Sequence, residues 1–131
     1  MAAALDNLGA VILFVEDLPR SRSFYHETIG LDVQFEDDES VGFRLKETHF
    51  IVLQVDRARI QLQGEPTATA RSAATAFLTS FTDDVDALHA DLSRRGISFF
   101  QEPTDMPWGM RTAYFKDPDG HVWEIAQEIN P

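Results

Sequence analysis

The chain has 131 residues, and its 22 acidic side chains against 11 basic ones give a formal net charge of −11 at pH 7. This charge, with a pI near 4.6, excludes electrostatically driven binding to nucleic acid or to an anionic membrane surface. There is no cysteine, so disulfides, thiolate metal sites and cysteine nucleophiles are excluded as well.

The first half of the chain predicts a strand, a helix and three further strands. An uninterrupted apolar run predicts the first strand at residues 10–15, and Asp17 and Gly30 mark the two ends of the helix. Alternating or apolar segments predict strands at 31–36, 41–46 and 49–55. Residues 56–63 fit either a strand or a short helix, and we assign residues 57–75 to a linker.

The second half repeats this order. It predicts a strand at 76–81, a helix between Asp84 and Gly96, a strand at 97–101, a loop at 102–109 and strands at 110–116 and 121–127. The chain is therefore an internal duplication of βαβββ modules, one at about 9–56 and one at about 76–128, within a single domain of residues 1–131. Neither half can bury both faces of its sheet alone, so we expect a homodimer.

The start of the chain carries no basic residue before its apolar residues, and no apolar run approaches the roughly 18 residues of a membrane span. We therefore expect a cytoplasmic protein that has no contact with membranes.

Two segments carry a family resemblance: VEDLPRSRSFYHETIGLDV at residues 15–33 and KDPDGHVWEIAQ at residues 116–127. They resemble the vicinal oxygen chelate superfamily, which includes glyoxalase I, extradiol dioxygenases, fosfomycin-modifying enzymes and bleomycin resistance proteins. The resemblance implies an α+β fold in which tandem βαβββ modules form curved mixed sheets with a cup-shaped cavity, the helices lying on the outer face. Such motifs specify the fold without specifying the activity.

Enzymes of that superfamily bind a divalent metal in the cup through the first and last strands of each module. The resemblance places these positions at Ala10, Val52, Phe77 and Glu124, of which Glu124 alone is a metal ligand. A slip of two residues in the first module would add only Gln54. One monodentate carboxylate does not hold a catalytic divalent ion. The resemblance therefore implies the metal-free branch, with no metal and no other cofactor.

Strand alternation predicts which side chains face the cup. If Lys116 pairs with His121, Arg111 and Phe115 share the face of Glu124, and Arg111 is close enough to pair with its carboxylate. That pair would either be structural or orient a ligand. Trp108 is either a lid over a planar ligand or a packing residue. The predicted ligand-binding residues are Phe14, Phe50, Phe77, Trp108, Arg111, Phe115 and Glu124.

Three functions follow from these residues. We expect a metal-free protein that binds a small molecule and sequesters an aromatic or cationic compound such as an antibiotic. The alternative is a metal-dependent lyase, isomerase or dioxygenase of the glyoxalase type, which requires a different register in at least two strands. The third is a metal-free enzyme, because desolvation would make an unpaired Glu124 a stronger base while Arg111 holds an enolate or carboxylate. The incomplete ligand set favours binding over catalysis.

Overall fold

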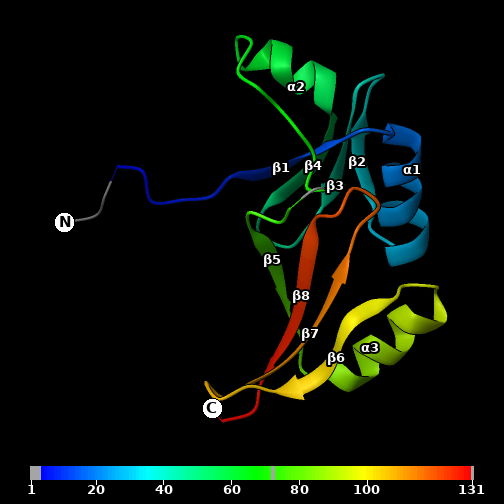
Figure 1. Cartoon of the computed structure of the whole chain (residues 1–131), viewed down its shortest axis with the longest axis vertical. Helices are drawn as coiled ribbons and strands as arrows, with labels where there is room; N and C mark the ends of the chain where they lie inside the picture. The colour runs from blue at the N-terminus through cyan, green and yellow to red at the C-terminus, as the bar shows by residue number, and fades with distance from the viewer. Residues whose placement is uncertain (1–3, 72, 131) are drawn as a thin grey trace. The chain divides into compact units, whose positions relative to one another are not determined.

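The structure is a computed structural model that describes residues 4–71 and 73–130. The chain divides into two units, Met1–Ala68 and Thr69–Pro131. Each unit contains one four-stranded mixed sheet, as Figure 1 shows. The duplication that the sequence predicts is therefore present as two units of the same α+β architecture.

The elements of the first unit are β1 (Ala10–Val15), α1 (Leu18–Arg22), η1 (Ser23–Ile29), β2 (Val33–Glu36), β3 (Ser40–Arg44), β4 (His49–Gln54) and α2 (Val55–Gln61). The strand order is β1-β4-β3-β2, with β1 parallel to β4 and the other neighbours antiparallel. The sequence of residues 56–63 fits either a strand or a short helix, and the structure has a helix there, α2. This helix occupies the first part of the segment that we assigned to a linker.

The first predicted helix begins and ends where the sequence indicates. The side chain of Asp17 accepts a hydrogen bond from the backbone N–H of Arg20 at 3.2 Å, and Gly30 ends the helix at φ 95°. Its second part, η1, is a π-helix, a wider turn that the sequence does not predict. The helix buries Ser21 and Tyr25 completely against the sheet.

The helix-covered face of the first sheet contains Phe50, which corrects its predicted place in the cup. The ring of Phe50 lies edge-on to that of Tyr25, with 4.8 Å between their centroids, and is buried. Val52 shares this face because side chains alternate along a strand. Phe14 pairs with Leu53 and lies on the opposite, open face.

The elements of the second unit are β5 (Phe77–Phe81), α3 (Val85–Arg94), β6 (Phe99–Asp105), β7 (Met110–Lys116) and β8 (Val122–Glu128), in the strand order β5-β8-β7-β6. The predicted helix is confirmed: the Asp84 side chain accepts from the Ala87 N–H at 3.0 Å, and Gly96 follows its last turn at φ 96°. Figure 1 shows α3 alongside β6, on one face of this sheet.

Strand β6 is longer than predicted, because it continues through residues that the sequence analysis assigned to a loop. Pro103 lies within it. The strand is at the edge of the sheet, and its pairing with β7 shifts register between Phe99 and Gln101 and again between Gln101 and Thr104. A proline is tolerated at such a place, since an edge strand with irregular pairing does not need every backbone N–H.

The register between β7 and β8 differs by one residue from the prediction. Lys116 pairs with Val122, and not with His121. The Asp117 side chain accepts hydrogen bonds from the backbone N–H groups of Asp119 and His121, both at 2.9 Å, so His121 belongs to the turn. A slip of one residue exchanges the two faces of a strand. Arg111 and Phe115 therefore face α3, which corrects their predicted place in the cup.

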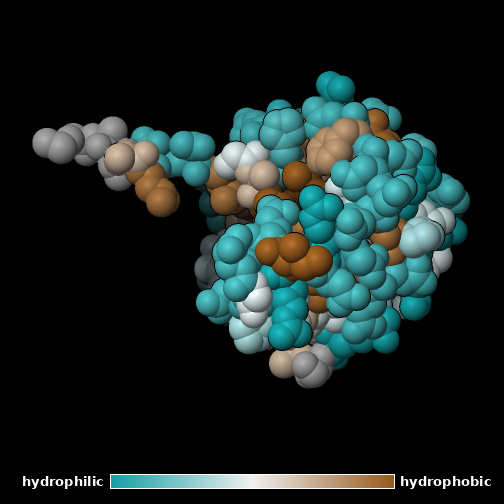
Figure 2. Space-filling view, turned by 90° about the horizontal axis from the view of Figure 1, so that it is seen from above, coloured by the Kyte–Doolittle hydropathy of each residue, from teal (hydrophilic) through white to brown (hydrophobic). Residues whose placement is uncertain are grey.

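The surface is mostly hydrophilic on the face that Figure 2 presents, with hydrophobic residues in separate groups and along the extended segment before β1. That segment contains Leu5 and Leu8, which are both exposed. None of the helices in residues 4–71 and 73–130 has the length and the hydrophobicity that a membrane-spanning helix requires.

Candidate ligand-binding site

The open face of the second sheet has a buried carboxylate at its centre. Glu124 of β8 pairs with Tyr114 of β7 on one side and with Thr79 of β5 on the other. Its side chain is only 8% exposed. Thr79 Oγ1 donates to Oε1 of Glu124 at 2.7 Å, and the Tyr114 hydroxyl donates to Oε2. Each carboxylate oxygen therefore has a hydroxyl partner, which is how a polar group tolerates burial.

Further polar side chains lie between Tyr114 and the edge strand. Gln101 Nε2 of β6 donates to Thr112 Oγ1 of β7 at 3.3 Å, and Thr112 lies on the same face of β7 as Tyr114. Burial, followed by the hydrogen bond to Glu124, raises the pKa of the Tyr114 hydroxyl, while the neighbouring Thr112 hydroxyl lowers it in part. We call the row of Thr79, Glu124, Tyr114, Thr112 and Gln101, which crosses all four strands of the sheet, the polar chain.

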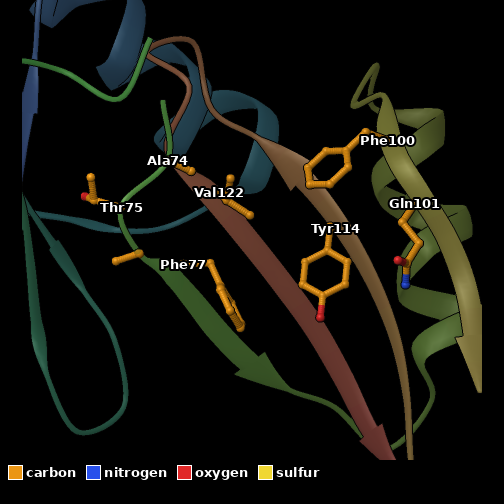
Figure 3. Close-up of a pocket in the computed structure, with 8 residues that line it drawn as sticks. Ala74, Thr75, Phe77, Phe100, Gln101, Tyr114 and Val122 are labelled. Atoms are coloured by element: carbon orange, nitrogen blue, oxygen red, sulfur yellow. The ribbon is translucent and has the colours of Figure 1, made fainter. Parts of the chain in front are cut away.

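A pocket of about 710 Å³ lies beside this polar chain. Figure 3 shows its aromatic residues, with the Tyr114 ring between Phe77 and Phe100. Phe100 stacks on Tyr114 at 5.9 Å and 24°, and Phe77 lies edge-on to Tyr114 at 5.7 Å. The pocket is lined by Ala74, Thr75, Ala76, Phe77, Phe100, Gln101, Tyr114 and Val122. Its walls are therefore apolar and aromatic, as in most small-molecule sites.

The structure places two of the predicted site residues at this pocket. Phe77 lines it and is 54% exposed, and Glu124 lies next to it on the same sheet face. Trp108 is 66% exposed in the turn between β6 and β7 and is not among the lining residues. Phe14 lies on the open face of the first unit and Phe50 beneath its helix.

Arg111 and Phe115 instead belong to the packing between the sheet and α3. Arg111 forms two bonds to Asp86 of α3, both at 3.0 Å, and one to Asp105 at 2.9 Å. These carboxylates raise the pKa of Arg111, and Arg111 in turn lowers the pKa of Asp86. Phe115 stacks on Trp123 with 6.5 Å between centroids. The predicted pairing of Arg111 with Glu124 is wrong.

The same position in the first unit has no polar group. Ile12 lies five residues before the helix cap Asp17, as Thr79 lies five residues before the cap Asp84. Ile12 pairs with Ile51 and Thr79 pairs with Glu124, so Ile51 corresponds to Glu124. By the next pairing in each sheet, Gly42 corresponds to Tyr114. The ring of Phe35 occupies the space that a side chain at Gly42 would need: a Cβ there would lie 2.0 Å from Cε2 of the ring. The metal-ligand position assigned to Val52 therefore moves to Ile51.

Sequence reasoning missed Tyr114, Thr112, Phe100 and Gln101. The first two were missed because of the hairpin register, and the signal for the correct register is Asp117, whose side chain can bind the N–H groups of the turn that follows. Phe100 and Gln101 are neighbours in sequence, yet both line the pocket. The register shift beside them allows this, because a β-bulge breaks the alternation of faces.

The comparisons with known proteins agree with this architecture. The sequence profile of the Glyoxalase/Bleomycin resistance protein/Dioxygenase superfamily matches residues 7–125. YraH, an uncharacterized protein of Bacillus subtilis, is 30% identical over 121 residues, which cover 89% of this chain and 94% of YraH. The chain belongs to this superfamily.

Two solved structures extend the comparison. A glyoxalase/bleomycin resistance protein/dioxygenase from Nocardioides has a TM-score of 0.87 at 21% identity, with 98% of this chain and 87% of that chain covered. TnmS3, an antibiotic binding protein from Streptomyces sp. CB03234, has a TM-score of 0.75 at 28% identity, with 97% and 99% covered. The first likeness concerns the fold alone.

The superfamily includes metal-dependent enzymes, whose ligands come from the first and last strands of each module. In this chain those positions are Ala10, Ile51, Phe77 and Glu124. The one carboxylate among them accepts hydroxyl hydrogen bonds at both oxygens. Across residues 4–71 and 73–130, no group of three His, Asp or Glu side chains could hold a metal ion. These residues do not fit a divalent cation, which requires several oxygen or nitrogen ligands.

Proposed function

We propose that this protein binds a planar, cationic small molecule in the pocket of the second unit, without a metal and without transforming the ligand. The observation that carries the proposal is the combination of an aromatic pocket with the buried carboxylate of Glu124 beside it. Aromatic rings favour a flat ligand through stacking, and they attract a cation through their negative faces. The Lys116 ammonium already lies 5.5 Å from the centroid of Phe100, which illustrates that attraction within the chain.

Electrostatics supports a cationic ligand at two ranges. At short range, Glu124 has hydroxyl partners, which satisfy its hydrogen bonds but do not neutralise its charge. At long range, the net charge of −11 raises the concentration of cations near the surface. The similarity to TnmS3, an antibiotic binding protein, supports a ligand of the antibiotic class.

The two enzyme hypotheses find less support in the site. Arg111, which was to hold an enolate or carboxylate beside Glu124, faces the other side of the sheet and bonds to Asp86 and Asp105. The metal-dependent alternative needs ligands at Ala10, Ile51 and Phe77, whose side chains have no donor atom. Binding without chemistry is the function that uses the residues actually present.

We extend the proposal to a homodimer, in which a second copy covers the exposed aromatic residues of the open sheet face. Phe81 is 76% exposed and Phe100 is 59% exposed. Rings this exposed in a monomer favour association. Sedimentation velocity tests the dimer: a single species with the mass of one chain contradicts it.

The binding proposal is tested by calorimetric titration with bleomycin, other aromatic cationic compounds and neutral aromatic analogues of the same size. Calorimetry suits this site better than tryptophan emission, because neither Trp108 nor Trp123 lines the pocket. We expect cations to bind more tightly than their neutral analogues and to raise the melting temperature. The variant Glu124→Gln should reduce this preference, and Phe14→Leu in the other unit is the control. Absence of heat and thermal shift with every compound contradicts the proposal.

A further inference from the structure

The buried carboxylate of Glu124 directs the two hydroxyl groups beside it. A carboxylate only accepts hydrogen bonds, so the single hydroxyl protons of Thr79 and Tyr114 are both directed to Glu124. The Tyr114 hydroxyl, although Tyr114 lines the pocket, therefore has no proton left to donate to a ligand.

The Gln101 amide is oriented by its hydrogen bond to the neighbouring strand. Its Nε2 donates to Thr112 Oγ1 at 3.3 Å, and only the NH₂ end of an amide can donate. This bond occupies the NH₂ end and leaves Oε1, the acceptor end, outside it.

The carbonyl end of Gln101 is consequently the end that is available to the pocket. Gln101 lines the pocket, and Figure 3 shows its side chain directed into the region next to Tyr114. Among the residues that the structure describes, none donates a hydrogen bond to Oε1 of Gln101. The other lining residue with a polar side chain apart from Tyr114 is Thr75. The pocket thus offers an amide acceptor within a wall that is otherwise largely apolar.

We propose that Gln101 determines specificity in this pocket, selecting planar ligands that carry an N–H or O–H donor at the edge of the ring over ligands that carry an acceptor there. Thr112 is the positioning residue, since its hydroxyl oxygen accepts the hydrogen bond from the NH₂ end of the amide. The inference rests on the proposed binding function and adds the chemical group that the ligand must present.

The test uses two probes of the same shape and charge. Tryptamine has an indole N–H, and its benzofuran analogue has a ring oxygen in the same place, with the same ammonium side chain. We expect calorimetry to show that the wild-type protein binds tryptamine about tenfold more tightly, because one hydrogen bond is lost and an acceptor faces Oε1 in the analogue. In Gln101→Met, which keeps the length of the side chain, the ratio should fall to about one.

A second pair of variants tests the positioning role and guards against a folding defect in Gln101→Met. Thr112→Val removes the hydroxyl and lets the amide turn over, so the probe ratio should fall toward one. Thr112→Ser keeps the hydroxyl and should keep the wild-type ratio. Equal affinities for the two probes in the wild type, or an unchanged ratio in both Gln101→Met and Thr112→Val, overturn the inference while leaving the binding function standing. Failure of the wild type to bind either probe counts against the binding function itself.

Discussion

The hydroxyl of Tyr114 donates a hydrogen bond to Oε2 of Glu124 from the directly opposite position on the neighbouring strand. The pair joins the wall of the pocket to a carboxylate that is almost fully removed from solvent. A carboxylate in such a place depends on its donors, because an unsatisfied buried acceptor destabilises the folded state.

Tyr114→Phe should therefore lower the free energy of unfolding by about 1–3 kcal/mol, the usual cost of removing one partner of a buried charged acceptor. Urea denaturation measures the change. In the Glu124→Leu background the same substitution should cost much less, because no carboxylate remains to lose its donor. Equal costs in both backgrounds would show that the hydroxyl does not stabilise Glu124.

Tyr114 should also make stability depend on pH in the alkaline range. Its pKa is raised by burial and by the bond to Glu124, so the folded protein retains a proton that the unfolded chain releases near pH 10. The stabilisation is complete below that pH and is lost as the pH rises through the folded pKa. Tyrosinate absorbance of the wild type minus that of Tyr114→Phe isolates this group. A midpoint at or below about 10 contradicts the assignment.

Arg111→Met should destabilise the protein at neutral pH, because Arg111 links Asp86 of α3 to Asp105 at the end of β6. The pKa of Asp86 is lowered by Arg111, so the stabilisation is present above the ordinary range of aspartate and is lost as the pH falls through the folded value. The difference in melting temperature between wild type and variant should therefore shrink in acid.

The control is Arg59→Met, which removes one positive charge from α2 in the other unit. Because Arg111 faces away from the pocket, Arg111→Met should leave ligand affinity unchanged. A large loss of affinity would support the predicted position of Arg111 beside Glu124, which the structure contradicts.

Gly42→Ala should displace the ring of Phe35. The added Cβ would lie 2.0 Å from Cε2 of that ring, and the ring must move outward because the backbone of β3 is held on both sides. We expect a cost of about 1 kcal/mol in urea denaturation, near the lower end of overpacking effects since Phe35 is partly exposed.

In the Phe35→Ala background the same substitution should be neutral or stabilising, because alanine in a strand is better than glycine once the space is free. Gly9→Ala is the matched control: its Cβ would meet only Asn7 Oδ1, at 3.9 Å. An equal cost of Gly42→Ala with and without Phe35 would show that the ring is not the obstacle.

The sequence predicted the parts of this molecule that local chemistry determines. Asp17 and Asp84 cap helices because their side chains accept backbone N–H groups, and glycines end both helices in the left-handed conformation. The repeated order of elements and the family resemblance followed from the same local signals. The placement of Phe77 and Glu124 on one face also needed only alternation along single strands.

The site itself could not be predicted fully, because it depends on pairing between strands. The backbone N–H of His121 donates to the Asp117 side chain, so the pairing of β7 with β8 begins at Val122 and not at His121. This shift of one residue places Tyr114, and not Phe115, on the pocket face. The bulge that turns both Phe100 and Gln101 toward the pocket lies on an edge strand containing a proline, where alternation fails. The same kind of error placed Phe50 on the open face of the first sheet.

The ring of Phe35 over Gly42 has a consequence for stoichiometry. A chain built from two copies of one module has, in principle, two equivalent places for a guest. In the first unit the ring of Phe35 occupies the space above Gly42. Ile12 and Ile51 occupy the positions that correspond to Thr79 and Glu124 in the second unit. Saturation should therefore be reached at one ligand per chain, with half of the duplicated architecture serving only as scaffold.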